Sequence, residues 1–275
     1  MVQPWFKKNG IWRLLQQLRQ NLCLAMMPKT VVEHSYCGET LKVAIEDPLA
    51  KGWYDHDWPM LGEIRLLRES RLKHGALVFD LGGHQGVVGM ILAKNVGEMG
   101  KIIIAEPNPH NFKMIQKNLA LNKMNNVIPL QVAIGGTEGT LEFSSGLNGT
   151  AATVSKYGIT QKVPMTTMEQ LVKAHGCPQV VFLDIEGFEE LALKAGKSAF
   201  NGNCDFFVEV HVNAGLEAAG GSVSGILEFF PPNMFDRYVH HDNGMNPIKI
   251  EEAKSDFFNT RFFLTALAKN LSLVS

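Results

Sequence analysis

The chain has 275 residues, of which 45% are hydrophobic and 19% charged, and its formal net charge is −1. This length can bury the core of one large α/β domain, and the near-zero charge gives no electrostatic reason to expect a nucleic-acid-binding protein. Its four cysteines are far apart and form no CxxC pair. That spacing argues against a zinc ribbon and a secreted disulfide framework and favours a reduced, cytoplasmic protein.

Residues 1–40 predict a basic, amphipathic helical extension. Apolar residues recur between Ile11 and Leu22, and no acidic residue precedes Glu33. Charges interrupt the apolar positions, which argues against a signal peptide, and no apolar run approaches the roughly 20 residues that span a bilayer. We expect the apolar face to dock on the domain or on the second subunit of a homodimer. The alternative is peripheral contact with the anionic inner face of a membrane.

Residues 41–275 predict one α/β domain. It opens with a strand over 41–45 and a helix over 58–73. Short apolar runs then alternate with helical segments, which is typical of a Rossmann-like, doubly wound, mostly parallel sheet with right-handed crossovers. The expected core strands are 76–81, 101–105, 127–134, 180–184 and 205–210, and the first two crossover helices are about 87–95 and 110–122.

The remaining elements complete this sheet. Extra strands are expected at 140–143 and 162–165, followed by a helix over 166–174 with Thr167 as its N-cap. Segments 235–240 and 261–266 fit an antiparallel pair that closes the sheet. Ligands of such sheets bind at the carboxyl ends of the strands, near the point where the strand order reverses.

A glycine-rich turn follows the first core strand. A dinucleotide fingerprint, GxGxxG, would need glycine at 82, 84 and 87, but His84 and Val87 occupy the last two positions. What is present is Asp80 two residues before Gly82, and Gly86 four residues after it. We interpret this spacing as suited to a ligand with an ammonium and a carboxylate group. A tight turn without a ligand is the alternative.

An acidic residue, Glu106, ends the second core strand and is followed by Pro107 and Asn108. A carboxylate at this place can accept hydrogen bonds from both hydroxyls of a ribose. It lies about 20 residues beyond the glycine turn, as ribose recognition requires. The alternative is an ordinary solvated loop acid.

These segments together resemble the FkbM-type branch of the class I methyltransferases. The matching pieces, in order, are FDLGGHQG (79–86), AEPNPHNF (105–112), KNLALN (117–122), VAIGGTEGTLEF (132–143), VPMTTMEQL (163–171), FLDIEGFEELALKAG (182–196) and FVEVH (207–211). The resemblance implies a seven-stranded sheet, S-adenosylmethionine as cofactor, and O-methylation of a sugar hydroxyl or another small polar acceptor. The expected cofactor-binding residues are Asp80, Gly82, Gly83, His84, Gly86, Glu106, Pro107 and Asn108.

Three positions depart from the family pattern. The family usually reads GAN at Gly83-His84-Gln85, often has a lysine at Phe182, and tends to carry an acid at Gly136. Because Gly136 stands where the family tends to carry an acid, no residue is assigned to adenine recognition.

Three polar residues follow the fourth and fifth core strands and are the expected catalytic residues. Asp184 and Glu186 follow strand four and His211 follows strand five, so all three should face the acceptor. A base there would take the proton of an alcohol acceptor. Two acids and a histidine can also hold a divalent metal, although no metal ligand is assigned. The structural alternatives are a helix N-cap for Asp184 and a core histidine for His211.

Other features leave alternatives open. Tyr54 and Trp58 can form an aromatic lid over the cofactor or fasten the N-terminal segment, and the loops 144–160 and 213–225 are expected near the acceptor. A methyltransferase acting on protein or nucleic acid is one rival, although the Asp184-Ile185-Glu186-Gly187 turn lacks the Pro-Pro-aromatic pattern of that class. The other rival is a non-catalytic domain that retains the fold and binds a partner through the N-terminal helix.

Overall fold

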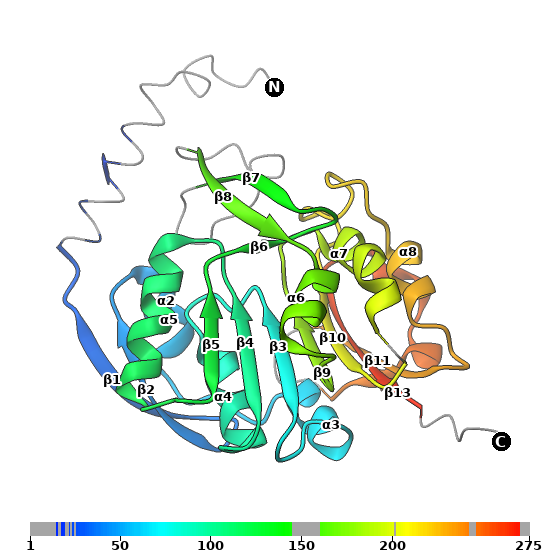
Figure 1. Cartoon of the computed structure of the whole chain (residues 1–275), viewed down its shortest axis with the longest axis horizontal. Coiled ribbons are helices and arrows are strands. Elements are labelled where there is room, and N and C mark those ends of the chain that lie inside the picture. Colours follow the sequence, from blue (N-terminus) through cyan, green and yellow to red (C-terminus); the bar gives the residue numbers. More distant parts are fainter. Residues whose placement is uncertain are drawn as a thin grey trace.

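The computed structural model describes residues 26–144, 160–200, 202–241 and 246–269, together with residues 15, 18, 19, 22 and 24. A central eight-stranded sheet has the strand order β12-β11-β13-β10-β9-β3-β4-β5. Figure 1 shows this sheet running through the middle of the molecule. Its strands are β3 (Leu77–Leu81), β4 (Lys101–Ala105), β5 (Val127–Leu130), β9 (Val180–Leu183), β10 (Asp205–Val210), β11 (Phe235–His240), β12 (Ile248–Lys249) and β13 (Phe262–Ala268).

The pairing confirms a doubly wound, mostly parallel sheet. Strands β5, β4, β3, β9 and β10 are parallel to one another, whereas β13 is antiparallel to both β10 and β11. Seven strands were expected, and the two-residue β12 adds an eighth at the edge. The chain builds β3, β4 and β5 in one direction and then returns to place β9 on the other side of β3. The switch point is therefore between β3 and β9.

The two faces of the sheet carry separate hydrophobic cores, because successive side chains of a strand point to opposite sides. On one face Val78, Ile102 and Phe182 pack with the N-terminal hairpin and with α3, α4 and α5. On the other face Phe79 and Ile103 pack with α6, α7 and α8. The described helices are α2 (Pro48–Tyr54), α3 (Gly62–Glu69), α4 (Val87–Val96), α5 (Pro109–Leu121), α6 (Met168–His175), α7 (Glu189–Gly196) and α8 (Val223–Phe229), with short 3₁₀ turns at 197–199, 250–252 and 255–259.

Side chains cap several helices as the sequence indicates. Thr167 accepts a hydrogen bond from Gln170 N at the start of α6, as expected. Asn108 caps α5, which begins at Pro109. Asp47, which the sequence analysis did not single out, caps α2 in the same way before Pro48. Proline at the first helical position costs nothing, because the N–H it lacks would have no helical partner.

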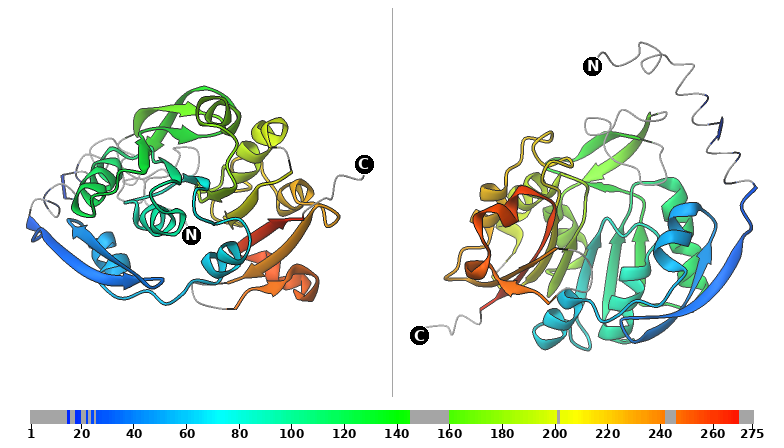
Figure 2. Two further views of the ribbon diagram at one scale, coloured as in Figure 1. Left: turned by 60° about the horizontal axis from the view of Figure 1, so that its bottom comes forward. Right: turned by 180° about the vertical axis from the view of Figure 1, so that it is seen from behind.

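A β-hairpin precedes the Rossmann core. Strand β1 (Thr30–Tyr36) was not expected and pairs with β2 (Glu39–Ile45) in an antiparallel register. The expected domain boundary at residue 40 falls inside this hairpin, where Ser35 pairs with Thr40. Figure 2 shows the hairpin, in blue, lying along the outer side of the sheet near α2.

Two sequence expectations about element boundaries were wrong. The helix expected over 58–73 begins only at Gly62, because Trp58 extends alongside β1 and exchanges backbone hydrogen bonds with Ser35 and Cys37. The strand expected over 127–134 ends at Leu130, and a turn closed by Val132 N and Leu130 O redirects the chain.

After that turn a second, smaller sheet begins. Its order is β6-β8-β7, formed by β6 (Ala133–Ile134), β7 (Gly139–Ser144) and β8 (Thr160–Thr166). In Figure 1 this sheet lies across the arrowheads of β3, β4 and β5, above the carboxyl ends of the core strands. It therefore forms a roof over the edge where ligands of this fold bind.

The described residues between Leu15 and Met26 are helical and, apart from the half-buried Leu24, exposed. Leu15, Leu18 and Leu22 lie in this helix, and more than half of each residue is accessible to solvent. Docking of this face on the domain, the preferred expectation, is therefore not observed for these residues. No helix among the described residues is both long and apolar enough to cross a bilayer.

Candidate active site

A cavity of about 400 Å³ opens at the carboxyl ends of β3, β4 and β9. It lies at the switch point of the sheet, where the sequence placed the ligand. Most of the expected site residues line it, namely Asp80, Gly82, Gly83, His84, Glu106, Pro107, Asp184 and Glu186. Gly86, Asn108 and His211 lie behind this wall: Gly86 and Asn108 are the N-caps of α4 and α5, and His211 is buried beside the acidic residues.

The glycines of the turn are required by the protein's own atoms. A Cβ at Gly82 would lie 1.7 Å from the carbonyl oxygen of Asp184, and a Cβ at Gly83 would lie 2.4 Å from Ile104 Cγ2. Gly82 also has φ +95°, a conformation that other residues rarely adopt. The sequence analysis attributed these glycines to close approach of a ligand. The structure shows that they first allow close approach of β9 and β4.

Asp80, at the end of β3, is a buried carboxylate whose Oδ2 has no hydrogen-bond partner among the described residues. Burial raises the pKa of Asp80 to about 7, against the lowering effect of the nearby backbone amide of Gly89. A buried carboxylate without a cationic partner is costly, so this site fits a ligand that brings a positive charge.

Glu106, at the end of β4, is held in place by two backbone amides. Asn108 N donates to its Oε1 at 2.8 Å, and His84 N donates to its Oε2 at 3.0 Å. Burial nevertheless raises the pKa of Glu106 to about 8, against the lowering effect of these hydrogen bonds. Each carboxylate oxygen has a further lone pair, so the orientation suits a ligand with two neighbouring hydroxyl groups.

An aromatic wall closes the cavity beside the glycine turn. The rings of Trp53 and His84 are 4.9 Å apart between centroids, and Trp58 Nε1 donates to Trp53 O at 2.8 Å. Tyr54 Oη lies 2.7 Å from His84 Nδ1. All four side chains line the cavity, and Trp58 also packs edge-on against Tyr36 in β1. Trp58 thus fastens the hairpin, as one reading expected, while a lid over the cofactor stays a prediction that the position of both side chains in the cavity wall allows.

A buried polar network fixes this wall over the glycine turn. Asp47 accepts hydrogen bonds from Ala50 N at 2.8 Å and Gln85 Nε2 at 2.6 Å, and His110 Nε2 lies 2.9 Å from its Oδ2. Although burial raises the pKa of Asp47, the contacts with His110, Ala50 and Gln85 lower it to about 2. Asn118 adds a second link, because it bonds both Ala44 N and the Gln85 carbonyl. Helix α2 is therefore fastened to both the turn and α5.

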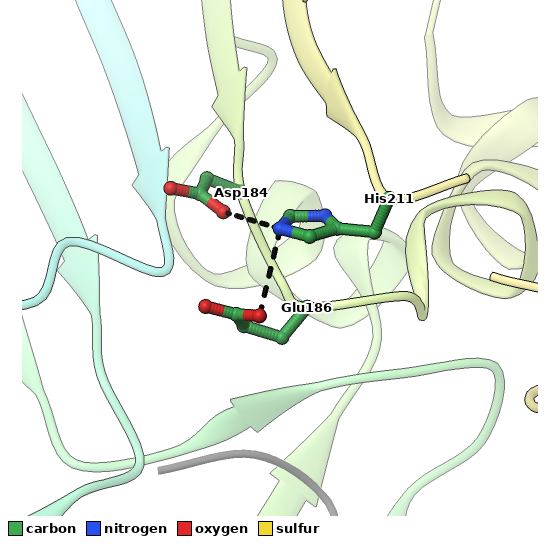
Figure 3. A group of neighbouring side chains, drawn as sticks. All are labelled: Asp184, Glu186 and His211. Atoms are coloured by element: carbon green, nitrogen blue, oxygen red, sulfur yellow. Dashed lines mark ion pairs between the residues drawn. The ribbon is translucent and has the colours of Figure 1, made fainter. Parts of the chain in front are cut away.

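The three expected catalytic residues come together on the opposite side of the cavity (Figure 3). His211 Nε2 lies 3.7 Å from Asp184 Oδ1 and 3.5 Å from Glu186 Oε2. Its Nδ1 lies 2.9 Å from Oε1 of the buried Glu189, which the sequence analysis did not single out. Glu186 has φ +55°, an unusual conformation for a residue other than glycine. Backbone strain of this kind is often found at functional sites.

Burial and neighbouring charges shift the pKa values of His211 and Asp184. Burial lowers the pKa of His211, but the hydrogen bond and charge of Glu189 together with Asp184 and Glu186 raise it to about 10. Burial and the charge of Glu209 raise the pKa of Asp184 well above its usual range, against the opposing charge of His211. Asp184 is surrounded by protein, yet 44% of its side-chain surface can be reached from the cavity. The acidic neighbours therefore favour the protonated form of His211, which lies behind the cavity-facing carboxyl group of Asp184.

The same cluster is the candidate metal site. The ligand atoms of Asp184, Glu186 and His211 lie within 4.8 Å of one another. A proton and a metal ion compete for the lone pair of His211 Nε2, and the raised pKa favours the proton at neutral pH. With Nδ1 of His211 held by Glu189 and Nε2 facing the two acids, the donor set fits a divalent cation as well as an imidazolium between carboxylates, and a bound cation would displace the proton.

An aromatic floor extends from the acidic cluster across the sheet. Phe182, Phe207 and Phe263 line the cavity, with ring centroids 4.9 Å apart for the first pair and 5.8 Å for the second. At its edge, Arg261 Nη1 lies 2.8 Å from Glu209 Oε1. The sequence analysis missed this floor and Arg261, because three phenylalanines on separate strands look like ordinary core residues until the strand order is known.

The roof sheet supplies an apolar slot. Val132, Ile134, Leu141 and Phe143 line the cavity above the carboxyl end of β4. Gly136, where an acid was expected from the resemblance, packs near Leu191. The loop expected over 144–160 lies almost wholly outside the described residues, and within the described chain none of the residues 213–225 lines this cavity.

The sequence profile of the family described as "Methyltransferase FkbM domain" matches residues 80–244, more than half of the chain. The chain belongs to the FkbM methyltransferase domain family. The match covers the glycine turn, Glu106, the acidic cluster and β10, and begins after the hairpin and α2. The Trp53–Tyr54 part of the cavity wall is therefore supplied by a segment outside the matched region.

Solved structures with a similar fold are distant. A putative rRNA methylase from Clostridium thermocellum is 13% identical, with a TM-score of 0.46 over 74% of this chain and 92% of that one. A methyltransferase FkbM from Methylobacillus flagellatus KT is also 13% identical, with a TM-score of 0.47 over 70% of this chain and 43% of that one. This chain thus spans less than half of the latter protein. No curated protein sequence matches the chain.

Proposed function

We propose that this FkbM domain uses S-adenosylmethionine to methylate a hydroxyl group of a sugar or another small polar acceptor. The observation that carries the proposal is the pair of buried carboxylates at the ends of adjacent strands, Asp80 and Glu106, which face one cavity. Their spacing along two neighbouring strand ends suits a ligand with a cationic end and a ribose.

The cavity residues fit the cofactor part by part. Asp80, whose Oδ2 has no partner, is placed to receive the cationic amino-acid end, directly or through water. Glu106 is oriented by two amides to accept the ribose hydroxyls. The slot of Val132, Ile134, Leu141 and Phe143 offers an apolar surface for a purine ring. When bound, S-adenosylmethionine would supply a methyl group activated by the positive charge on sulfur.

The acceptor side of the cavity has the composition of a site for a hydroxylated ring. Phe182, Phe207 and Phe263 offer an apolar floor, and Asp184, Glu186, Glu209 and Arg261 surround it with hydrogen-bonding groups. Aromatic surfaces with a few placed polar groups are how small-molecule sites fix a polar ligand. This arrangement favours a sugar over a long anionic polymer, because Arg261 is the only lysine or arginine among the described residues that line the cavity.

Asp184 is the residue best placed to take the proton of an acceptor hydroxyl. It faces the cavity, and its raised pKa makes it a stronger base than an ordinary aspartate. His211 Nε2 lies 3.7 Å from Asp184 Oδ1 and attracts this carboxyl group electrostatically. The imidazole ring is itself held in place by its contact with Glu189. The protein must also hold the acceptor oxygen roughly 3 Å from the methyl carbon and keep water out of the cavity. The aromatic wall and the roof sheet, which cover the cavity, favour the exclusion of water.

Calorimetric titration with S-adenosylhomocysteine tests the cofactor assignment. We expect saturable binding by the wild-type chain and a loss of roughly tenfold to a hundredfold in affinity for Glu106→Ala, because hydrogen bonds to a charged group are lost. Glu98→Ala is the matched control, since Glu98 is an exposed acid beyond the end of α4. Absent binding by the wild type, or equal affinity in both variants, would overturn the assignment.

The acceptor class is tested separately by methyl transfer to a panel of simple sugars. The expected product is an alkali-stable methyl ether on a sugar hydroxyl, detected by mass spectrometry. Transfer only to a protein side chain or to RNA would contradict the sugar proposal while leaving the cofactor assignment intact.

A further inference from the structure

We infer that the helix ahead of β1 binds the surface of an anionic membrane. Leu15, Leu18, Leu22 and Met26 are helical residues with exposed fractions of 52%, 55%, 60% and 74%. Their spacing of three, four and four residues places them on one face of a helix. An apolar stripe exposed to this extent has no partner on the described part of the domain, so it is available to another surface.

The charges of this segment favour lipid headgroups as that surface. Residues 1–32 carry five positive charges and no negative one, whereas the whole chain has a net charge of −1. The basic residues are Lys7, Lys8, Arg13, Arg19 and Lys29. A segment that combines an exposed apolar stripe with an excess of positive charge binds the interface of an anionic bilayer, because apolar burial and attraction to the headgroups add.

A second copy of the same helix is a poorer partner. Pairing two copies would bring together two segments whose charges are all positive, and like charges across an interface are repulsive. The sequence also places three aromatic residues, Trp5, Phe6 and Trp12, near the basic ones. Tryptophan is enriched where membranes meet water, because one end of its ring system is apolar and the other can donate a hydrogen bond.

The geometry of the chain allows this contact without disturbing the cavity. The helix is followed by Pro28 and then by β1, whose partner strand β2 packs against α5. The cavity lies at the carboxyl ends of the core strands and includes no residue of this helix among those described. Membrane binding and cofactor binding are therefore expected to be independent properties.

Co-sedimentation of the full chain with vesicles tests the inference. We expect binding to vesicles of phosphatidylcholine mixed with phosphatidylglycerol at least about tenfold tighter than to phosphatidylcholine alone, and weaker in high salt. The double variant Leu18→Glu/Leu22→Glu should lose about tenfold or more of this affinity, because it puts charge on the stripe. The control is Met99→Glu, which changes an 89% exposed methionine on another part of the surface.

Three results would overturn the inference. The first is equal binding of the wild type to the two vesicle compositions, or no binding to either. The second is a loss of vesicle affinity in Met99→Glu as large as the loss in the double variant. The third is a wild-type dimer, seen by light scattering, that becomes monomeric in the double variant without any vesicle binding in the wild type. Unchanged affinity for S-adenosylhomocysteine in the double variant would show that the variant is folded.

Discussion

Tyr54 Oη and His84 Nδ1 lie 2.7 Å apart in the wall of the cavity. Burial raises the pKa of Tyr54 well above its usual value and lowers that of His84 to about 4, so both groups are neutral at pH 7. If the phenol donates to Nδ1, His84 Nε2 carries the ring proton. If His84 Nδ1–H donated to Tyr54 Oη instead, the phenol proton would have no acceptor among the described residues. Tyr54 therefore selects the tautomer that presents an N–H at Nε2.

His84 Nε2 is buried and has no hydrogen-bond partner among the described residues. Because it sits in the glycine turn, we predict that it donates to the carboxylate of the methionine end of the cofactor. His84→Phe should weaken S-adenosylhomocysteine binding about tenfold, and Tyr54→Phe by a few-fold because the tautomer is no longer fixed. Calorimetry measures both. A ligand lacking the amino-acid end, such as adenosine, should bind all three proteins equally; a matching loss for adenosine would contradict this role.

Cofactor affinity should rise with pH. In the free protein the pKa values of Asp80 and Glu106 are raised to about 7 and about 8, so both carboxyls are largely protonated in mildly acidic solution. A ligand with a cationic end and hydroxyl donors favours the ionised forms, so binding releases protons. From about pH 6 to about pH 9 the dissociation constant should fall by roughly tenfold or more, and titrations in buffers of different ionisation enthalpy should show the proton release. A pH-independent affinity would be inconsistent with two buried acids at the site.

The same shifts predict how the free protein responds to pH. The folded protein binds more protons at Asp80 and Glu106 than the unfolded chain does. Their contribution to stability is therefore fully present below about pH 4, the range of the unfolded pKa values, and is lost as the pH rises through about 7 to 8. Thermal unfolding should show a falling melting temperature over that interval, and a smaller fall when S-adenosylhomocysteine is bound.

Asp47→Asn should destabilise the fold and weaken cofactor binding together. The carboxylate accepts from Ala50 N and Gln85 Nε2 and contacts His110, and it is fully buried. Loss of charge-assisted hydrogen bonds should lower the free energy of unfolding by about 2–4 kcal/mol, measured by urea denaturation. Because Trp53 and Tyr54 follow on the same helix, affinity should also fall. Asp236→Asn, at an exposed aspartate of β11, is the matched control.

Much of the Rossmann core could be predicted from the sequence, because its strands are buried on both faces. Runs such as 101–105 and 205–210 are mostly apolar, with charges only at Lys101, Asp205 and Glu209, and their predicted bounds agree with β4 and β10. The hairpin was partly missed because β1, with residues Glu33, His34 and Ser35 among its seven, lacks that signal. Its pairing with β2 depends on a contact that local sequence does not encode.

The site residues that lie at the carboxyl end of a single recognisable strand could be predicted from the sequence. Asp80, Glu106 and Asp184 each follow a recognisable buried strand, and all three line the cavity. Glu189 and Arg261 could not be assigned in the same way, because Glu189 lies in the helix α7 and Arg261 precedes β13. Their roles depend on the strand order. Because β10 lies between β9 and β13, His211 contacts Glu189 and Glu209 contacts Arg261.

Asp184→Asn should separate catalysis from cofactor binding. If Asp184 takes the acceptor proton, its loss should lower kcat by about a hundredfold to ten-thousandfold, while S-adenosylhomocysteine affinity changes little because the expected cofactor contacts are elsewhere. The amide cannot titrate, so the rise of kcat with pH expected for the wild type should disappear in the variant. Once an acceptor sugar is identified, steady-state kinetics over a pH series measures this directly, with Asp236→Asn again as the control for the substitution itself. A variant that keeps the wild-type rate and pH profile would instead assign the proton to Glu186 or Glu209, the other acids lining this side of the cavity.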